Sequence, residues 1–205
     1  MPVTVTDPKD TNAMTTTTTS PVIPDVERRD LLAALATARA GLTRTVQGLS
    51  DEQIGERPTV SALCPGGVIK HVAAMEESWL RFVLDGPSAM NFDLPDGVTW
   101  DDLMAGTARE VPQWLVEHQN DFAVLPGETL AGILARYERV AARTEEIVAA
   151  LPDLSATHPM PEAPWSEPGG EWSVRAVLMH VLAETAQHAG HADILRESLD
   201  GQRSS

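Results

Sequence analysis

Cysteine is almost absent from this chain of 205 residues. Cys64 is the one cysteine, so no disulfide can form within the chain and a reducing compartment is expected. Apolar runs of membrane-spanning length are absent as well, and the N-terminus has neither the cationic region nor the apolar core of a signal peptide. We therefore expect a cytoplasmic protein that has no membrane partner.

Positive charge is also scarce. The chain has 15 Lys and Arg residues against 30 Asp and Glu residues, which gives a formal net charge of -15 at pH 7. The pair Arg28 and Arg29 is isolated and does not form part of a basic cluster. Such a surface repels phosphate backbones, so we expect no nucleic-acid partner.

Helical periodicity appears only after residue 24. Residues 1–24 are rich in Thr and Pro and are predicted to be a disordered tail. Apolar residues then recur every three or four positions over 25–49, 65–84, 128–151 and 174–199, which predicts four long helices. No strand pattern is visible, so we expect one all-α domain over 25–201, a four-helix bundle, followed by a short tail at 202–205.

Two connections in this bundle are long. Residues 88–127, between the second and third helices, contain several Pro residues and are predicted to be a crossover with helical pieces, one of them capped by Thr99. Residues 153–170 hold four Pro residues and cannot be helical throughout. Ser173 is expected to cap the last helix.

The last predicted helix carries a group of metal-binding residue types. Glu184, His188 and His191 are spaced by four and three positions, so they lie on one helix face within an arc of about 60°. Their donor atoms can converge on one ion. His188 also falls on the apolar seam of the helix, where a buried ring needs a polar partner, and a metal is one such partner.

The candidate residues of this chain also have interpretations that involve neither a metal nor catalysis. A lone histidine on an apolar helix face, such as His71, is more often a hydrogen-bonded core residue, and a glutamate four residues before a histidine is more often an exposed ion pair. Cys64 precedes a helix whose dipole could activate its thiol; a small buried loop residue is the alternative. His118 and His158 fall in predicted loops and are expected to be exposed.

Three segments of the chain resemble the DinB family. They are Leu49-Ser50-Asp51-Glu52-Gln53, the run Gly66-Gly67-Val68-Ile69-Lys70-His71-Val72-Ala73-Ala74-Met75-Glu76-Glu77-Ser78-Trp79, and His180-x-x-x-Glu184-x-x-x-His188-Ala189-Gly190-His191-Ala192-Asp193. The resemblance covers residues 25–201 and is closest to members of the actinobacterial type. It implies a DinB-like four-helix bundle with a long crossover between helices two and three.

The resemblance also implies a divalent metal site. Carried over residue by residue, its ligands are His71, Glu184 and His188; many members have His in place of Glu184, whereas thiol-dependent isomerases of the superfamily have Glu. His191 falls where many members carry Gln, which implies a place behind the ligands or facing the substrate as an alternative to that of a direct ligand. For an enzyme, we expect His191 to have a catalytic role in orienting substrate or water. Imidazole and carboxylate ligands are compatible with zinc, our first choice, and with nickel, iron or manganese.

Two His and one carboxylate leave coordination positions open, as catalytic sites do. The resemblance implies an S-transferase or isomerase that uses a low-molecular-weight thiol such as mycothiol on a small electrophilic substrate, and a homodimer. The alternative is a metal-stabilised or metal-free bundle that binds a small molecule or a protein without catalysis. Fold alone does not separate the two.

Overall fold

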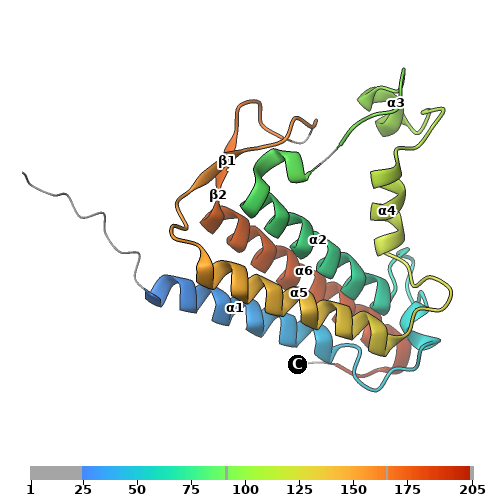
Figure 1. Ribbon diagram of the computed structural model, residues 1–205. Coiled ribbons are helices and arrows are strands. Elements are labelled where there is room, and N and C mark those ends of the chain that lie inside the picture. Colours follow the sequence, from blue (N-terminus) through green and yellow to red (C-terminus); the bar gives the residue numbers. More distant parts are fainter. Residues whose placement is uncertain (1–24, 91, 165, 204–205) are drawn as a thin grey trace, which may run out of the picture.

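Four long helices lie side by side in the computed structural model, which describes residues 25–90, 92–164 and 166–203 (Figure 1). They are α1 (Asp25–Arg44), α2 (Pro65–Asp85), α5 (Leu130–Ala150) and α6 (Val174–Asp200). The predicted all-α four-helix bundle is confirmed. The tail predicted at 1–24 and the last two residues lie outside the described residues.

Short elements occupy the connections between the long helices. They are η1 (Gln53–Gly55), η2 (Gly86–Ala89), α3 (Trp100–Ala105), α4 (Gln113–Asp121), β1 (Thr157–Pro159) and β2 (Glu171–Ser173). The crossover between α2 and α5 thus contains helical pieces, as predicted, and Figure 1 shows α3 and α4 outside the bundle. The antiparallel pair of β1 and β2 was not predicted, because three-residue strands are too short to show alternation.

Side-chain caps determine where several helices begin. Thr99 accepts a hydrogen bond from the backbone of Asp102, whose side chain accepts one in return from the Thr99 backbone. Ser173 accepts a hydrogen bond of 3.1 Å from the backbone N–H of Ala176. Both predicted caps are confirmed. The predicted first helix was too long: α1 ends at Arg44, and residues 45–48 form a turn, although Leu49 is still buried.

The core contains two apolar clusters along the bundle. One is built around Leu42, Ile69, Tyr137 and Leu195, and the other around Leu35, Phe82, Val148 and Val177. Met75 packs against both. Burying an aliphatic or aromatic side chain of this size contributes about 1.5–3 kcal/mol, so these contacts hold α2 and α6 at a fixed separation.

A buried ion pair crosses the bundle from α1 to α2. Arg39 Nε donates to Glu76 Oε2 at 3.2 Å, and Arg39 Nη2 donates to the other carboxylate oxygen. The Thr144 hydroxyl on α5 also donates to Glu76, which is 0% exposed. Three helices therefore meet at one carboxylate, five residues after His71.

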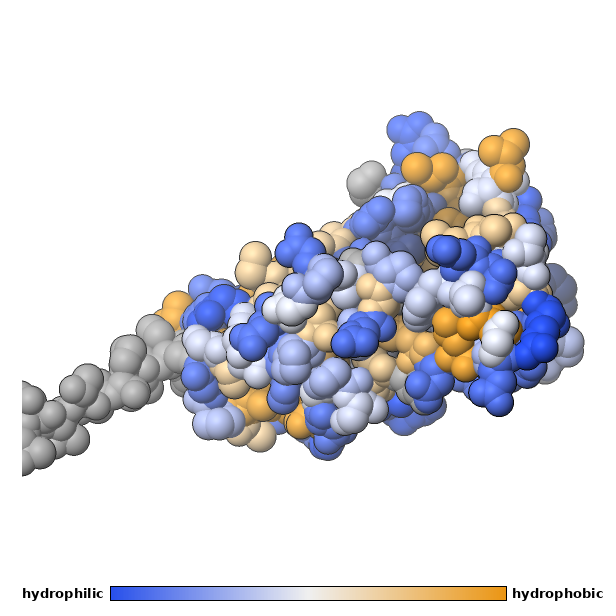
Figure 2. All heavy atoms as spheres, turned by 90° about the horizontal axis from the view of Figure 1, so that it is seen from above, coloured by the Kyte–Doolittle hydropathy of each residue, from blue (hydrophilic) through white to orange (hydrophobic). Residues whose placement is uncertain are grey.

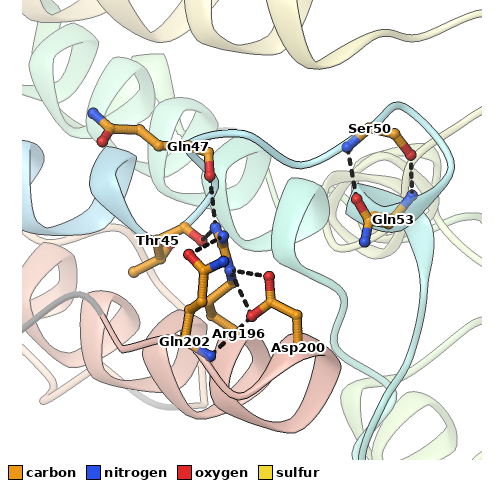
Figure 3. A network of polar contacts seen from close by, with 7 residues as sticks. All are labelled: Thr45, Gln47, Ser50, Gln53, Arg196, Asp200 and Gln202. Atoms are coloured by element: carbon orange, nitrogen blue, oxygen red, sulfur yellow. Dashed lines mark hydrogen bonds and ion pairs between the residues drawn. The ribbon is translucent and has the colours of Figure 1, made fainter.

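Arg196 links the end of α6 to the turn that follows α1 (Figure 3). Its Nη1 atom donates to the carbonyl oxygens of Thr45 and Gln47 at 2.9 and 2.8 Å, and its Nε atom donates to Asp200. The side chain of Gln202 accepts a further hydrogen bond from Nη2. Backbone carbonyls beyond α1 are thus satisfied by the helix that carries Glu184 and His188.

The face shown in Figure 2 has small apolar groups among polar side chains. The large exposed apolar residues of the described chain come from several elements; they include Val60, Met104, Met179 and Ile194. Scattered apolar residues are normal on a protein surface, so the homodimer stays a prediction. Among the described helices, none combines the length and the apolar character needed to cross a membrane.

Candidate metal centre

Three side chains from two helices converge between α2 and α6. His71 lies in the second turn of α2, and Glu184 and His188 lie one turn apart on α6. One donor atom from each lies within 4.8 Å of the other two. Glu184 Oε2 and His188 Nε2 are 3.6 Å apart. The structure therefore brings together the three residues that the sequence analysis selected as metal ligands.

The spacing and chemistry of this triad fit one divalent ion. Ligand atoms about 2.0–2.2 Å from a tetrahedral ion lie about 3.4 Å from one another. The donor atoms of Glu184 and His188, 3.6 Å apart, are close to that spacing, and that of His71 lies within 4.8 Å of both. Two imidazoles and one carboxylate are a donor set that zinc, nickel, iron and manganese accept.

Burial favours the uncharged form of both histidines of the triad. Burial lowers the pKa of His71 to about 3, with further lowering by the nearby His188 and His118. Burial also lowers the pKa of His188, against the opposing effect of the Glu184 carboxylate. A neutral imidazole has a free lone pair, which is the form that binds a metal.

Phe122, just beyond α4, covers the ring of His71. The two ring centroids are 3.9 Å apart and the ring planes are inclined by 20°. The backbone of Phe122 lies so close to Gly67, four residues before His71, that a Cβ there would overlap its carbonyl oxygen. Cys64 is buried, and its thiol lies 3.7 Å from the same oxygen, so the small buried residue is the interpretation that the structure supports.

Lys70 holds the segment that contains Phe122. Its ammonium group donates to the carbonyl oxygens of Asn120 and Ala123, at 3.3 and 2.7 Å, and to Glu128 Oε2 at 2.7 Å. Lys70 is buried, so these bonds replace its lost hydration. Two consecutive residues of α2 therefore have different roles: Lys70 fixes the segment that contains Phe122, and His71 belongs to the triad. The role of Lys70 was not predicted from the sequence.

The expectations for His118 and His158 were partly wrong. His118 is exposed, as predicted, but it belongs to α4 rather than a loop, and its ring meets that of His71 edge-on at 5.5 Å. His158 lies on β1 and is half-buried, because its ring packs against Phe82 and its Nε2 atom lies 3.1 Å from the Val83 carbonyl oxygen. The nine residues of α4 are too few for a clear helical period.

His191 contacts the triad without belonging to it. Its Nδ1 atom lies 3.4 Å from His188 Nδ1, whereas His188 Nε2 is the atom that faces Glu184. A ring that meets the far nitrogen of a ligand fixes the tautomer and orientation of that ligand. The catalytic role of His191 stays a prediction.

A cavity of about 1090 Å³ opens beside His71. It lies between α2, η2, α3 and α4, and its apolar wall includes Met75, Trp79, Met90, Trp100, Trp114 and Leu115. Trp114 is fixed by its indole N–H, which donates to the carbonyl oxygen of Asp93 at 3.0 Å. Pockets of about 300–1,000 Å³ hold drug-sized ligands, so this one has room for a small molecule and part of a second.

The fold and site define a class of protein: an all-α bundle with a cluster of two histidines and a carboxylate beside a large cavity. Within that class, the chain belongs to the mycothiol-S-transferase family, whose family model matches residues 30–201. The resemblance to the DinB family is confirmed by this match. A comparison with curated proteins gives no match for the chain.

Proposed function

We propose that this protein is a divalent-metal-dependent S-transferase that joins a low-molecular-weight thiol of the mycothiol type to a small electrophile. The observation that carries the proposal is the convergence of His71, Glu184 and His188 beside the large cavity. The family match supports a thiol as the second substrate. Isomerisation of an electrophile through a thiol adduct is the related reaction that the same site could perform.

The triad would hold the ion on one side and leave the other side open toward ligands. A bound divalent ion lowers the pKa of a thiol or water that coordinates it, and so makes a thiolate available near neutral pH. Zinc is our first choice for this ion, with nickel, iron and manganese as alternatives.

The other side chains would orient the reactants. Phe122 and His191 contact the rings of His71 and His188, so they would hold the triad in one geometry. The apolar wall that includes Trp79 would bind the electrophile and exclude water from its reactive carbon. In the transfer, the thiol proton leaves to solvent, the sulfur bonds to carbon, and the leaving group departs with the electron pair of the broken bond.

Transfer of a thiol to a fluorogenic electrophile tests this proposal. We expect wild-type protein loaded with zinc to accelerate the reaction, and His71→Ala to lose at least about 100-fold in rate, the scale expected when a group near the reacting atoms is removed. His158→Gln is the matched control, because it replaces a histidine outside the triad and keeps a side-chain amide near Val83. Zinc-loaded wild-type protein without thiol transfer would contradict the proposal.

A further inference from the structure

A second groove lies beside the cavity, between α2 and α5. It has a volume of about 490 Å³. Four arginines line it, namely Arg81, Arg136, Arg139 and Arg143, against one acidic residue, Glu77. Its remaining lining is apolar and consists of Leu80, Leu84, Val140 and Ile147. The groove therefore combines an apolar floor with guanidinium groups.

The lining of the groove is positively charged, whereas the whole chain has a negative net charge. Acidic residues outnumber basic ones by 30 to 15 overall, yet basic residues dominate the groove. Arg136 pairs with Glu77 at 3.3 Å and Arg143 with Glu146 at 3.1 Å. Within the described ranges, Arg81 and Arg139 form no ion pair, so their guanidinium groups are available to an anionic ligand.

The groove continues into the cavity beside His71. Glu77, Arg81 and Arg136 line both. Glu77 and Arg81 follow His71 by six and ten residues on α2, which corresponds to about 9 and 15 Å along the helix. One extended ligand can therefore have its reactive atom near His71 and its other end among the arginines.

From this juxtaposition we infer that the electrophile is amphiphilic, with an apolar body and an anionic group, a carboxylate or a phosphate, that binds Arg81 and Arg139. This inference rests on the proposed function and names its substrate class. The guanidinium group binds both anions in bidentate geometry. Glu77 of the larger cavity pairs with Arg136. The other two acids of that cavity, Glu117 and Asp121, come from α4, so the anionic end is directed to the α5 side.

The apolar surfaces along this path match the body of such a ligand. Trp79 and Met90 belong to the wall of the cavity, and Leu80 and Val140 to the floor of the groove. A hydrocarbon chain or an aromatic ring that covers them gains the free energy of apolar burial. A free inorganic anion would gain the arginine contacts alone. It should therefore bind more weakly than an amphiphilic ligand that has the same anionic group and an apolar body.

Binding of an unreactive pair of probes tests the inference without turnover. The probes are 8-phenyloctanoate and its carboxamide, which differ in charge at one end, titrated calorimetrically into zinc-loaded wild-type protein and two double variants. Arg81→Gln with Arg139→Gln removes the groove contacts. Arg29→Gln with Arg203→Gln is the control, because it removes the same charge from exposed sites.

We expect the wild type and the control to bind the acid about tenfold more tightly than the amide. This ratio of dissociation constants corresponds to the free energy of about two partly exposed ion pairs. The groove variant should bind both probes equally, with the affinity for the amide unchanged. The preference should fall as salt screens the charges. Equal binding of both probes to wild type, or a preference that survives in the groove variant, would overturn the inference.

Inorganic phosphate distinguishes a substrate site from an effector site. We expect it to displace the acid only at much higher concentration than the acid itself requires, because it has no apolar body. Equally tight phosphate binding would overturn the assignment to the electrophile. The binding results do not depend on turnover: thiol transfer without acid preference refutes this inference alone, and acid preference without thiol transfer refutes the proposed function alone.

Discussion

Phe122 lies flat over His71, with the two ring centroids 3.9 Å apart. The two residues come from different elements, α2 and the segment after α4, and are 51 positions apart in the chain. Gly67 makes this approach possible because it leaves room for the Phe122 carbonyl. The orientation of one candidate metal ligand thus depends on a contact between two backbones.

Gly67→Ala should destabilise the protein. The added Cβ would overlap the Phe122 carbonyl oxygen, and forced backbone shifts of this kind typically cost about 1–3 kcal/mol. The measurement is urea unfolding of the zinc-free protein. Gly41→Ala is the control, since a Cβ at that helical position meets nothing within 4 Å and should raise stability by up to about 1 kcal/mol. Equal effects of the two substitutions would contradict the tight approach at Gly67.

Phe122→Leu should weaken zinc binding several-fold. Leucine keeps most of the apolar volume but removes the stacked ring, and such a contact contributes about 0.5–1.5 kcal/mol. The measurement is competition with a chromophoric chelator. Phe92→Leu serves as control, because the ring of Phe92 packs on Trp114. Unchanged zinc affinity in Phe122→Leu would show that the stack does not orient the ligand.

Glu76→Gln should lower the free energy of unfolding by about 3–5 kcal/mol, because it removes the buried charged partner of Arg39. Glu145→Gln provides the comparison. Its carboxylate is 3.9 Å from Arg39 and 59% exposed, so we expect a change below about 1 kcal/mol. Chemical denaturation of both variants measures the difference, and a small effect at Glu76 would contradict the buried ion pair.

Asp200 should make the stability of the protein depend on pH in the acidic range, below about pH 4. Hydrogen bonds from Arg196, and then from the Gln202 backbone, lower the pKa of this carboxyl group. Its contribution is therefore complete above the unfolded pKa of about 3.9 and is lost as the pH falls through the folded pKa. The difference in melting temperature between wild type and Asp200→Asn should shrink below about pH 4. A difference independent of pH would refute this account.

Much of the fold followed from periodicity. The start of α2 at Pro65 and the cap at Ser173 were predicted because proline, serine and the apolar seam give strong local signals. The end of α1 was misjudged, because Val46 and Leu49 continue the apolar spacing although the helix has ended. The apolar spacing continues there because Val46 and Leu49 are buried in the core, although their backbone is not helical.

The candidate site was predicted in part. Glu184 and His188 stand out because they share one helix face, and His71 was joined to them by family resemblance. Phe122, Lys70 and His118 were not selected, because their roles arise from contacts between α2 and the crossover. The sequence gives no local signal for contacts over about 50 positions, and Gly67, which marks one of them, resembles any glycine near a helix start.

Metal content tests the central claim most directly. Elemental analysis of protein purified without chelators or nickel resin should give about one transition metal per chain, as one three-residue site requires. His71→Ala and His188→Ala should lose it, together with the rise in melting temperature that ion binding confers, whereas His191→Ala should retain it. A folded wild-type protein that is metal-free and binds no added zinc, or variants that keep full occupancy, would contradict the account.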